Sequence, residues 1–319
     1  MKQEKSTINR IFWISLCVLL SAYALTIIVT LGWGVLTSLK NNNELLPLYG
    51  ENWLGLPRLE GQVNSRKELF QLYNYQQIIK YYPQLEPKCV AEYVNGRGEF
   101  ISKPAEGGFP MVIVNTIVYT VVGSMLHTFI PAVVAYVVAK YDNVAGKIIT
   151  GAALFAMTTP IIGSQASMLT MLRTLGLYDT FWGYLLQKAS FTGMYFFVFT
   201  AFYESVPDSF AEAAEIDGAS QLSVLLSIII PLSVKMLSTV FVIQFIHFWN
   251  DYQTAYIYMP SHPTLAYAVW YLTSGNDVAG GDKTVRMASS MALAVPMLIA
   301  FIFLKDKMMG NVSMGGLKQ

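Results

Sequence analysis

The chain has 319 residues, of which 54% are hydrophobic and only 13% are charged, and its formal net charge is +1. High hydrophobicity with little net charge excludes an intrinsically disordered chain, and the lack of a basic surplus argues against nucleic-acid binding. Two cysteines are too few for a disulfide framework or a cysteine-based zinc site. The composition therefore favours a protein that crosses a membrane several times.

The predicted spans are the stretches between charged residues, because a helix needs about 20 mostly apolar residues to cross the hydrocarbon core. Six such stretches follow one another along the chain. They cover residues 11–36, 107–139, 148–172, 189–203, the segment that begins after Lys235 and reaches Asp251, and 287–304. We therefore expect an all-α integral membrane protein with six transmembrane helices.

Basic residues near the span ends predict the topology. They flank the first, second and last spans on one side: Lys2, Lys5, Arg10, Lys140, Lys147, Lys305 and Lys307. The positive-inside rule then places both termini, residues 1–10 and 305–319, in the cytoplasm. A signal peptide is the alternative for residues 1–36, but the apolar run exceeds the roughly 7–15 residues of such peptides, which favours a retained anchor.

Residues 37–108 form the one sizeable polar segment between predicted spans. The segment mixes Lys, Arg and Glu evenly and contains several Tyr and Trp residues, which predicts a small folded extracellular region. Cys89 lies in this region and Cys17 lies in the first span, so we expect no internal disulfide.

The connection between spans four and five, residues 205–235, is long and acidic. Pro207-Asp208 resembles a helix start, strong helix formers follow it, and Gly218 provides a helix stop. A second apolar stretch, Leu222 to Ile230, is closed by Pro231. The pattern predicts a short helix, a turn and a second helix that lies across the inner membrane surface.

Span five carries polar groups at membrane depth, where they are costly and indicate function. Gln244, His247 and Asp251 are spaced to share one helical face, with Trp249 and Asn250 beside them. Amide and carboxylate groups can bond sugar hydroxyls, and aromatic rings pack on sugar rings, so we expect these five residues to line a translocation path. The alternative is polar contact with a second membrane subunit.

Several motifs resemble one known family over nearly the whole chain. Glu212-Ala213-Ala214, followed after three residues by Gly218 and later by Pro231, resembles the EAA loop of bacterial ABC importer permeases. The extended form, EAAEIDGAS followed by IIIP, is similar to the carbohydrate branch of that family, the G-type subunit of maltose-like importers. Further landmarks of that branch are Thr37-Ser38-Leu39-Lys40, Asn74-Tyr75, Asn115-Thr116, Leu175-Gly176-Leu177, Thr180-Phe181-Trp182-Gly183, Trp249-Asn250-Asp251 and Gly316-Leu317-Lys318.

The resemblance implies roles for the residues of the EAA loop. In the family this loop is a coupling helix that sits in a cleft of the ATPase subunit. Glu212 would pair with a basic ATPase group, and Ala213 and Ala214 would form the contact face. Gly218 would make the turn, Asp217 would cap or brace the second helix, and Pro231 would complete the motif. An amphipathic helix lying on lipid is the alternative, but the loop's five acids before any Lys favour a protein partner.

The resemblance also implies the fold and the assembly. Residues 109–304 would form the type I importer domain. The extracellular segment 37–108 departs from the family by being longer, with extra residues between Tyr75 and Gly108 that we expect to contact a binding protein or shape the entrance. Residues 259–287 would reach into that binding protein, unless they form a mobile loop without specific contacts. The partners would be a second, related permease, two ATP-binding cassette subunits and an extracellular solute-binding protein.

The implied function is import of an oligosaccharide or sugar derivative across the cytoplasmic membrane. The chain has no phosphate-binding loop for ATP and no catalytic motif, so we expect a transport subunit that is not an enzyme. ATP and magnesium would bind the partner ATPases, with no cofactor or metal on this chain. The alternatives are a permease for a non-sugar solute and an ion-coupled secondary transporter with Asp251 as ion carrier.

Overall fold

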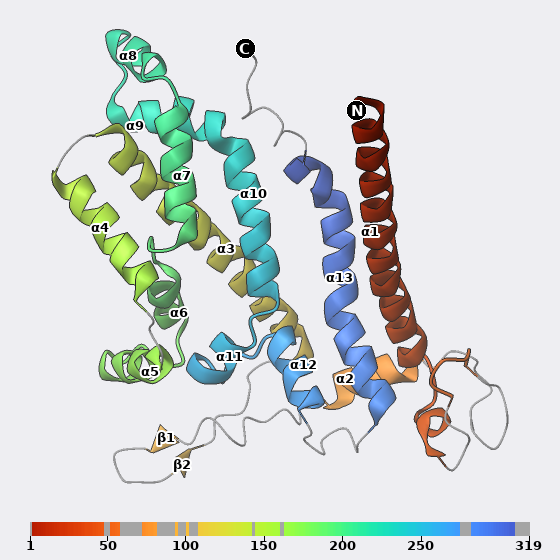
Figure 1. The fold of residues 1–319 in the computed structure, drawn as a ribbon. Helices are drawn as coiled ribbons and strands as arrows, with labels where there is room; N and C mark the ends of the chain where they lie inside the picture. Colours follow the sequence, from red (N-terminus) through yellow and green to blue (C-terminus); the bar gives the residue numbers. More distant parts are fainter. Residues whose placement is uncertain are drawn as a thin grey trace. The chain divides into compact units, whose positions relative to one another are not determined.

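The computed structural model describes residues 2–47, 52–57, 72–81, 93–94, 100–101, 108–141, 144–159, 163–274 and 282–309. The described residues are almost entirely helical (Figure 1). The exceptions to the expected all-α fold are two short strands, β1 (Tyr93–Val94) and β2 (Phe100–Ile101), which pair antiparallel with Tyr93 opposite Ile101. Cys89, the 316–318 landmark and most of 78–105 lie outside the described residues.

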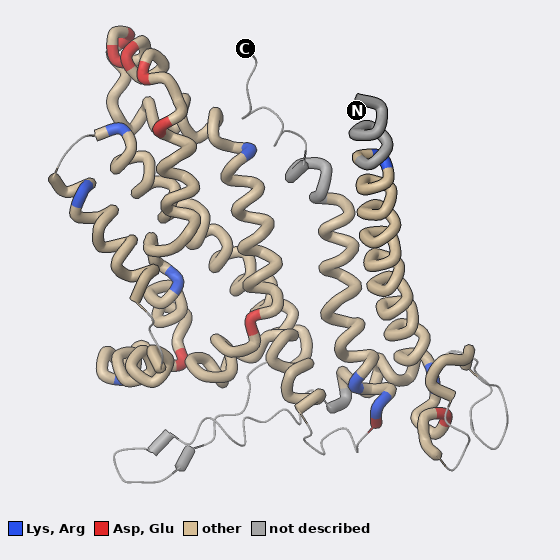
Figure 2. The backbone as a smooth tube through the Cα atoms, viewed as in Figure 1, with Lys and Arg blue, Asp and Glu red and all other residues tan. Residues whose placement is uncertain are grey.

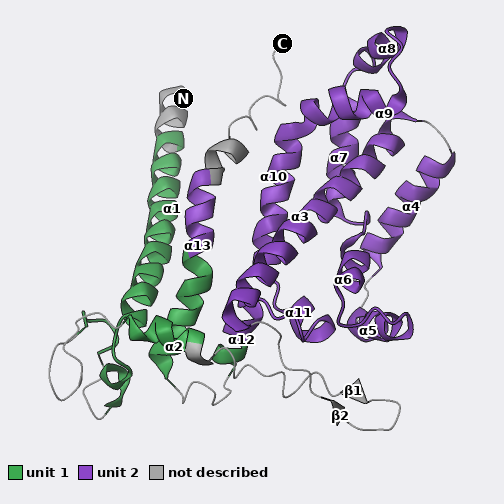
Figure 3. Ribbon diagram, turned by 180° about the vertical axis from the view of Figure 1, so that it is seen from behind, with its two compact units in different colours: residues 1–84, 271–295 green, residues 85–270, 296–319 purple. Residues whose placement is uncertain are grey.

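The chain divides into two compact units (Figure 3). Unit 1 comprises residues 1–84 and 271–295, and unit 2 comprises residues 85–270 and 296–319. The division falls within two helices, α12 (Leu265–Thr273) and α13 (Lys283–Met309).

Unit 1 contains α1 (Lys2–Ser38), a 3-10 turn (Asn42–Leu45), α2 (Tyr73–Tyr81) and the first part of α13. Two of the sequence landmarks meet here. The Asn74 amide donates to the Ser38 and Lys40 carbonyls at 2.8 Å each, and the Tyr75 and Ser38 hydroxyls lie 2.7 Å apart. The buried Lys40 ammonium donates to the Asn52 carbonyl at 2.7 Å. Hydrogen bonds between landmarks therefore join the end of α1 to α2.

The core of unit 2 is built on α3 (Gly108–Lys140), α7 (Met194–Ser205) and α10 (Ile230–Trp249), with α4 (Val144–Thr158) packed against α3. Small residues of α3 meet large aromatic ones of α7. The buried cluster includes Ala132, Ala135, Tyr136, Ala153, Phe196, Phe199, Tyr203 and Val240. Short helices follow: α5 (Ser164–Thr174), α6 (Phe181–Lys188) and α11 (Gln253–Tyr258).

Four described helices are long and apolar enough to cross a membrane: Asn9–Ser38, Gly108–Lys140, Gln221–Trp249 and Lys283–Phe303. The expected span 148–172 is not one helix, since α4 ends at Thr158 and α5 begins at Ser164. Gly163, with φ of +81°, precedes α5 in a conformation that glycine adopts without strain. The expected span 189–203 corresponds to α7, whose 12 residues extend only about 18 Å.

The second helix of the 205–235 connection also differs from the prediction. It is not closed by Pro231, because α9 (Gln221–Val224) continues through a π-helical turn (Leu225–Ile229) into α10. Proline lacks an N–H and clashes with the carbonyl four residues earlier, here that of Ser227. Ser227 lies in the π-helical turn, whose wider spacing accommodates the proline. Leu222 to Ile230 is therefore the beginning of a long apolar helix.

Candidate functional site

The EAA motif lies on α8 (Ser209–Ile216), a short helix at one end of unit 2 where several acidic residues lie close together along the backbone (Figure 2). The helix begins after Asp208 as predicted, and the Asp208 carbonyl accepts from the Ala211 and Glu212 N–H groups at 2.9 and 3.0 Å. The Asp208 side chain does not cap the helix; it forms an ion pair with Lys140 at 2.8 Å. None of the α8 side chains is fully buried.

The two alanines of the motif do not share a face. Ala214 is half-buried and packs, with Ala211, against the hydrophobic cluster of unit 2. Ala213 is exposed on the outward side with Phe210 and with Ile216, which is 86% exposed. The outward face available to a partner is thus Phe210, Ala213 and Ile216. Ala214 lies on the inner face of the helix, whose packing surface on unit 2 we call its seat.

The turn after α8 has the backbone that the sequence predicts for a glycine. Gly218 has φ of +82°, and the Ala219 N–H donates back to the Ala214 carbonyl at 2.9 Å. Asp217 is exposed and ends α8, whereas the cap of α9 is Ser220, whose hydroxyl accepts from the Ser223 N–H at 3.3 Å. The capping role expected of Asp217 therefore falls to Ser220.

A hollow of about 220 Å³ lies between α8, α9 and the end of α3. Its lining includes Glu212 and Glu215 from α8, together with Tyr136, Lys140, Tyr141, Pro207, Asp208, Ala211, Gln221 and Ile229. Glu212 is exposed, so its carboxylate is available to a basic group on a partner.

A second cavity, of about 570 Å³, occupies the other end of unit 2. Three of the five residues that we expect to line a translocation path also line this cavity: His247, Asn250 and Asp251. The other lining residues are Gln165, Gln187, Lys188, Ile246, Tyr252, Gln253, Thr254 and Tyr258.

The other two residues predicted for the translocation path, Gln244 and Trp249, do not line the cavity. Gln244 is buried with 6% exposure and does not line the cavity, and the Trp249 ring stacks on Phe245 with centroids 6.1 Å apart. Asp251 is not on the α10 face at all, because α10 ends at Trp249 with Asn250 as its C-cap.

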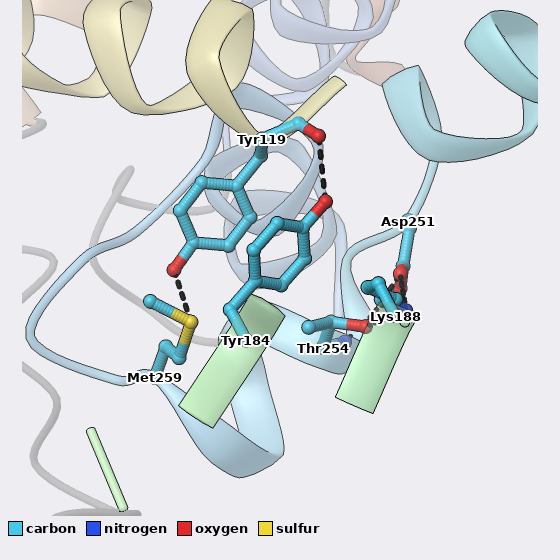
Figure 4. Close-up of polar contacts among 6 residues, drawn as sticks. All are labelled: Tyr119, Tyr184, Lys188, Asp251, Thr254 and Met259. Atoms are coloured by element: carbon cyan, nitrogen blue, oxygen red, sulfur yellow. Dashed lines mark hydrogen bonds and ion pairs between the residues drawn. The ribbon is translucent and has the colours of Figure 1, made fainter. Parts of the chain in front are cut away.

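Asp251 is the centre of a compact polar network (Figure 4). Its carboxylate accepts from the Thr254 N–H at 3.0 Å and from the Thr254 hydroxyl at 2.5 Å. The Lys188 ammonium lies 3.2 Å from the same carboxylate and 2.9 Å from the Thr254 hydroxyl. The side chains of Lys188 and Asp251 are only 13% and 15% exposed. Burial opposes the charge, but Lys188 and the Thr254 hydrogen bonds prevail and hold the pKa of Asp251 below its ordinary value.

Aromatic rings form the wall beside this network. Tyr119 of α3 and Tyr184 of α6 stack with centroids 4.4 Å apart, and the Tyr184 hydroxyl donates to the Tyr119 carbonyl at 2.6 Å (Figure 4). The Tyr119 hydroxyl contacts the Met259 sulfur. The Lys188 ammonium lies 5.0 Å from the Phe248 ring centroid, a cation–π distance. Close packing of α3 on α6 therefore fixes the position of the ammonium.

Sequence reasoning missed Lys188, Thr254 and Tyr184, because they come from other segments than the Asp251 stripe. One signal was present: Lys188 is the only basic residue between Arg173 and Lys235. Chemically, the cavity offers amide, hydroxyl, carboxylate, ammonium and tyrosine groups, a lining suited to a polyhydroxylated solute. Within the part of the chain that the structure describes, no group of three or more His, Cys, Asp or Glu could hold a metal ion.

Residues 129–313, more than half of the chain, match the family described as "Binding-protein-dependent transport system inner membrane component". The chain is 23% identical to the polygalacturonan/rhamnogalacturonan transport system permease of Bacillus subtilis over 62% of this chain and 73% of that protein. It is 25% identical to the melibiose/raffinose/stachyose import permease of the same species, over 64% of this chain and 75% of that protein. Among solved structures it resembles a bacterial ABC transporter involved in the import of the acidic polysaccharide alginate, with a TM-score of 0.69, 22% identity and coverage of 93% and 96% of the two chains.

Proposed function

The chain belongs to the binding-protein-dependent transport system inner membrane components, and from this premise we propose that it passes an oligosaccharide or sugar derivative across the membrane. As a member of this family it is a multi-pass protein of the cytoplasmic membrane and the permease subunit of an ABC importer. The family description itself implies a solute-binding protein and ATPase subunits as partners.

The polar cavity beside Asp251 is the observation that carries the choice of a sugar. Its amide, hydroxyl and charged groups can each bond a sugar hydroxyl, and the Tyr252 and Tyr258 rings supply apolar faces. The relatives described above include permeases for polygalacturonan/rhamnogalacturonan and for melibiose, raffinose and stachyose. A sugar path that runs past His247, Asn250 and Asp251 fits both observations.

Coupling to ATP hydrolysis is assigned to α8. The helix presents Phe210, Ala213 and Ile216 outward and keeps the Glu212 carboxylate accessible, as a helix that docks into a partner cleft requires. The chain itself would bind neither ATP nor magnesium, and a second permease would complete the membrane pair. Movement of α8 on ATP binding would switch the cavity between the two sides of the membrane.

Six spans with both termini in the cytoplasm complete the proposed topology. The four long helices supply four crossings, and α4 and α7 supply the other two. At about 1.5 Å per residue these two are shorter than the roughly 30 Å core, so each would cross with its neighbouring short helix, α5 or α6. The acidic α8 loop would then face the cytoplasm, and the Asp251 cavity would open toward the outer side.

Reconstitution of the complete importer in proteoliposomes tests the proposal. We expect uptake of labelled oligosaccharides that requires ATP and the binding protein, and none of a labelled peptide of similar size. Glu212→Ala should reduce uptake and recovery of the ATPase subunits, whereas the matched control Glu204→Ala, an exposed acid near the end of α7, should not. Peptide uptake would contradict the substrate class, and unchanged ATPase recovery in Glu212→Ala would contradict the role of α8.

A further inference from the structure

The end of α3 contacts the segment that leads into α8. Lys140 is the last residue of α3, and its ammonium donates to the Val206 carbonyl at 2.5 Å and to the Asp208 carboxylate at 2.8 Å. The Lys140 side chain is only 12% exposed, although that of Asp208 is 72% exposed. A cation shielded in this way makes a firmer contact than an ordinary surface ion pair. One flank of α8 is therefore bound to α3.

The next residue contacts the opposite flank. The Tyr141 hydroxyl donates to the Gln221 side-chain oxygen, and the Gln221 amide donates to the Glu215 carboxylate at 2.5 Å. Glu215 lies in the last turn of α8 and Gln221 begins α9. Consecutive residues at the end of α3 thus hold the chain before α8 and the chain after it.

The inner face of α8 rests on the same helix bundle. Ala211 and Ala214 pack against the cluster that contains Tyr136 of α3 and Tyr203 of α7. The Tyr136 and Tyr141 rings meet edge to face with centroids 6.4 Å apart. Small side chains bring α8 close to the bundle, and the two polar contacts prevent it from sliding or tilting on that seat.

We propose that Lys140 and Tyr141 form a clamp that makes α8 and α3 move together, so that they are positioning residues for the coupling of ATP hydrolysis to transport. The clamp rests on the proposed function of α8. Its consequence follows from the length of α3, whose 33 residues extend about 50 Å. The same helix carries Tyr119, whose carbonyl accepts from the Tyr184 hydroxyl of α6. The last residue of α6, Lys188, lines the Asp251 cavity. A push on α8 is then transmitted along α3 toward the substrate path.

The first test measures transport per ATP hydrolysed in proteoliposomes that contain the complete importer. In Lys140→Ala combined with Tyr141→Phe, we expect this ratio to fall about tenfold, the effect of losing a charge-assisted hydrogen bond on an equilibrium. ATPase recovery with the complex should stay unchanged. Lys140→Arg in an otherwise unchanged chain keeps the charge and both donors, so this variant should retain most of the parent's ratio of transport to ATP hydrolysis.

Lys235→Ala is the matched control. Lys235 is an exposed lysine of α10 whose ammonium makes no ion pair or side-chain hydrogen bond within the residues that the structure describes. The ratio should not change in this variant. An unchanged ratio in the Lys140 and Tyr141 variant, or a fall that is fully matched by loss of ATPase subunits, would overturn the clamp.

A second test needs no substrate, which separates the clamp from the choice of a sugar. Spin labels at Ser209→Cys on α8 and Val137→Cys on α3, in a chain with Cys17 and Cys89 replaced by Ser, report their distance within the complete complex. Weakening the clamp with Lys140→Ala and Tyr141→Phe should broaden the distribution of distances. A distribution as narrow as that of the parent would overturn the proposal, even if the importer carried a different solute.

Discussion

The two ends of unit 2 are built in opposite ways. At one end, α8 has no buried side chain and its contacts with the bundle are two polar links and a pair of alanines. At the other end, Lys188 and Asp251 are largely buried, and Tyr119 of α3 stacks on Tyr184 of α6. The exposed helix at the first end is one short segment, whereas the buried network at the second end is assembled from helices far apart in the sequence.

The difference between the two ends predicts whether a substitution alters stability, coupling or both. A helix that must fit a partner keeps its side chains exposed, so substitutions there should alter coupling more than stability. A cavity lined by α5, α6, α10 and α11 depends on mutual packing, so substitutions there should alter both. Measuring unfolding and transport together, at matched positions of the two ends, can break this comparison.

The Lys188–Asp251 pair should give the largest effect. Asp251→Ala leaves the Lys188 ammonium without its counter-ion in a site of 13% exposure, and we expect a loss of about 3 kcal/mol of stability and most of the transport. Lys188→Ala should cost less, because Asp251 keeps two hydrogen bonds from Thr254. Thermal unfolding of the purified importer in detergent measures both, and the double variant gives the coupling between the two residues.

The pair should also have a defined pH dependence. Because the pKa of Asp251 lies below its ordinary value of 3.8, its stabilising contribution is complete above about pH 4. The contribution is lost only as the pH falls through the lowered pKa. Equal unfolding temperatures for the parent and Asp251→Ala at neutral pH would show that the ion pair does not hold this end together.

The contrast between the two ends also explains what could be predicted from the sequence. The helix start near Asp208 and the turn at Gly218 depend on residues only a few positions apart, and both appear in the structure. The Asp251 network joins residues 63 and 66 positions apart, so only the folded arrangement of α6 and α11 reveals it. The inward turn of Ala214 was likewise out of reach, because the seat it packs on comes from α3 and α7.

The predicted span 148–172 differs from the structure for a related physical reason. Gaps between charged residues predict apolar stretches well, and the first, second and last gaps coincide with long apolar helices. The gap 148–172 carries no charge across the break between α4 and α5, so charge alone cannot locate the break. Likewise, Pro231 is a helix stop in most contexts, and only the preceding π-helical turn lets α10 include it.

Gly123→Ala should have the next largest effect and probes the packed end directly. A methyl group on Gly123 would lie 2.2 Å from the Tyr184 hydroxyl and 3.2 Å from the Phe248 ring. Both side chains contact Lys188, so relief of the clash must disturb the cavity. We expect a loss of about 2 kcal/mol in thermal unfolding, as in other overpacked interiors, together with reduced transport.

Gly151→Ala on α4 is the matched control for this change, since a methyl group there meets nothing within 4 Å. Replacing a helical glycine by alanine in open space should stabilise the helix slightly. If Gly123→Ala and Gly151→Ala unfold at the same temperature, the close approach of α3 and α6 does not govern this end of the unit.

The smallest effect on stability, at the most sensitive point for coupling, is expected at Gly218. Its φ of +82° strains any L-residue, yet nothing lies within 4 Å of an added methyl group, so Gly218→Ala should cost only about 1 kcal/mol of backbone strain. Asn tolerates this conformation better than Ala, so Gly218→Asn should unfold close to the parent. Transport per ATP should follow the same order, parent above Asn above Ala, because strain relieved by re-aiming the turn would tilt α8 on its seat. Equal transport per ATP in all three chains would mean that docking of the partner does not depend on the angle of α8. Substitutions at the exposed end would then change function as little as they change stability.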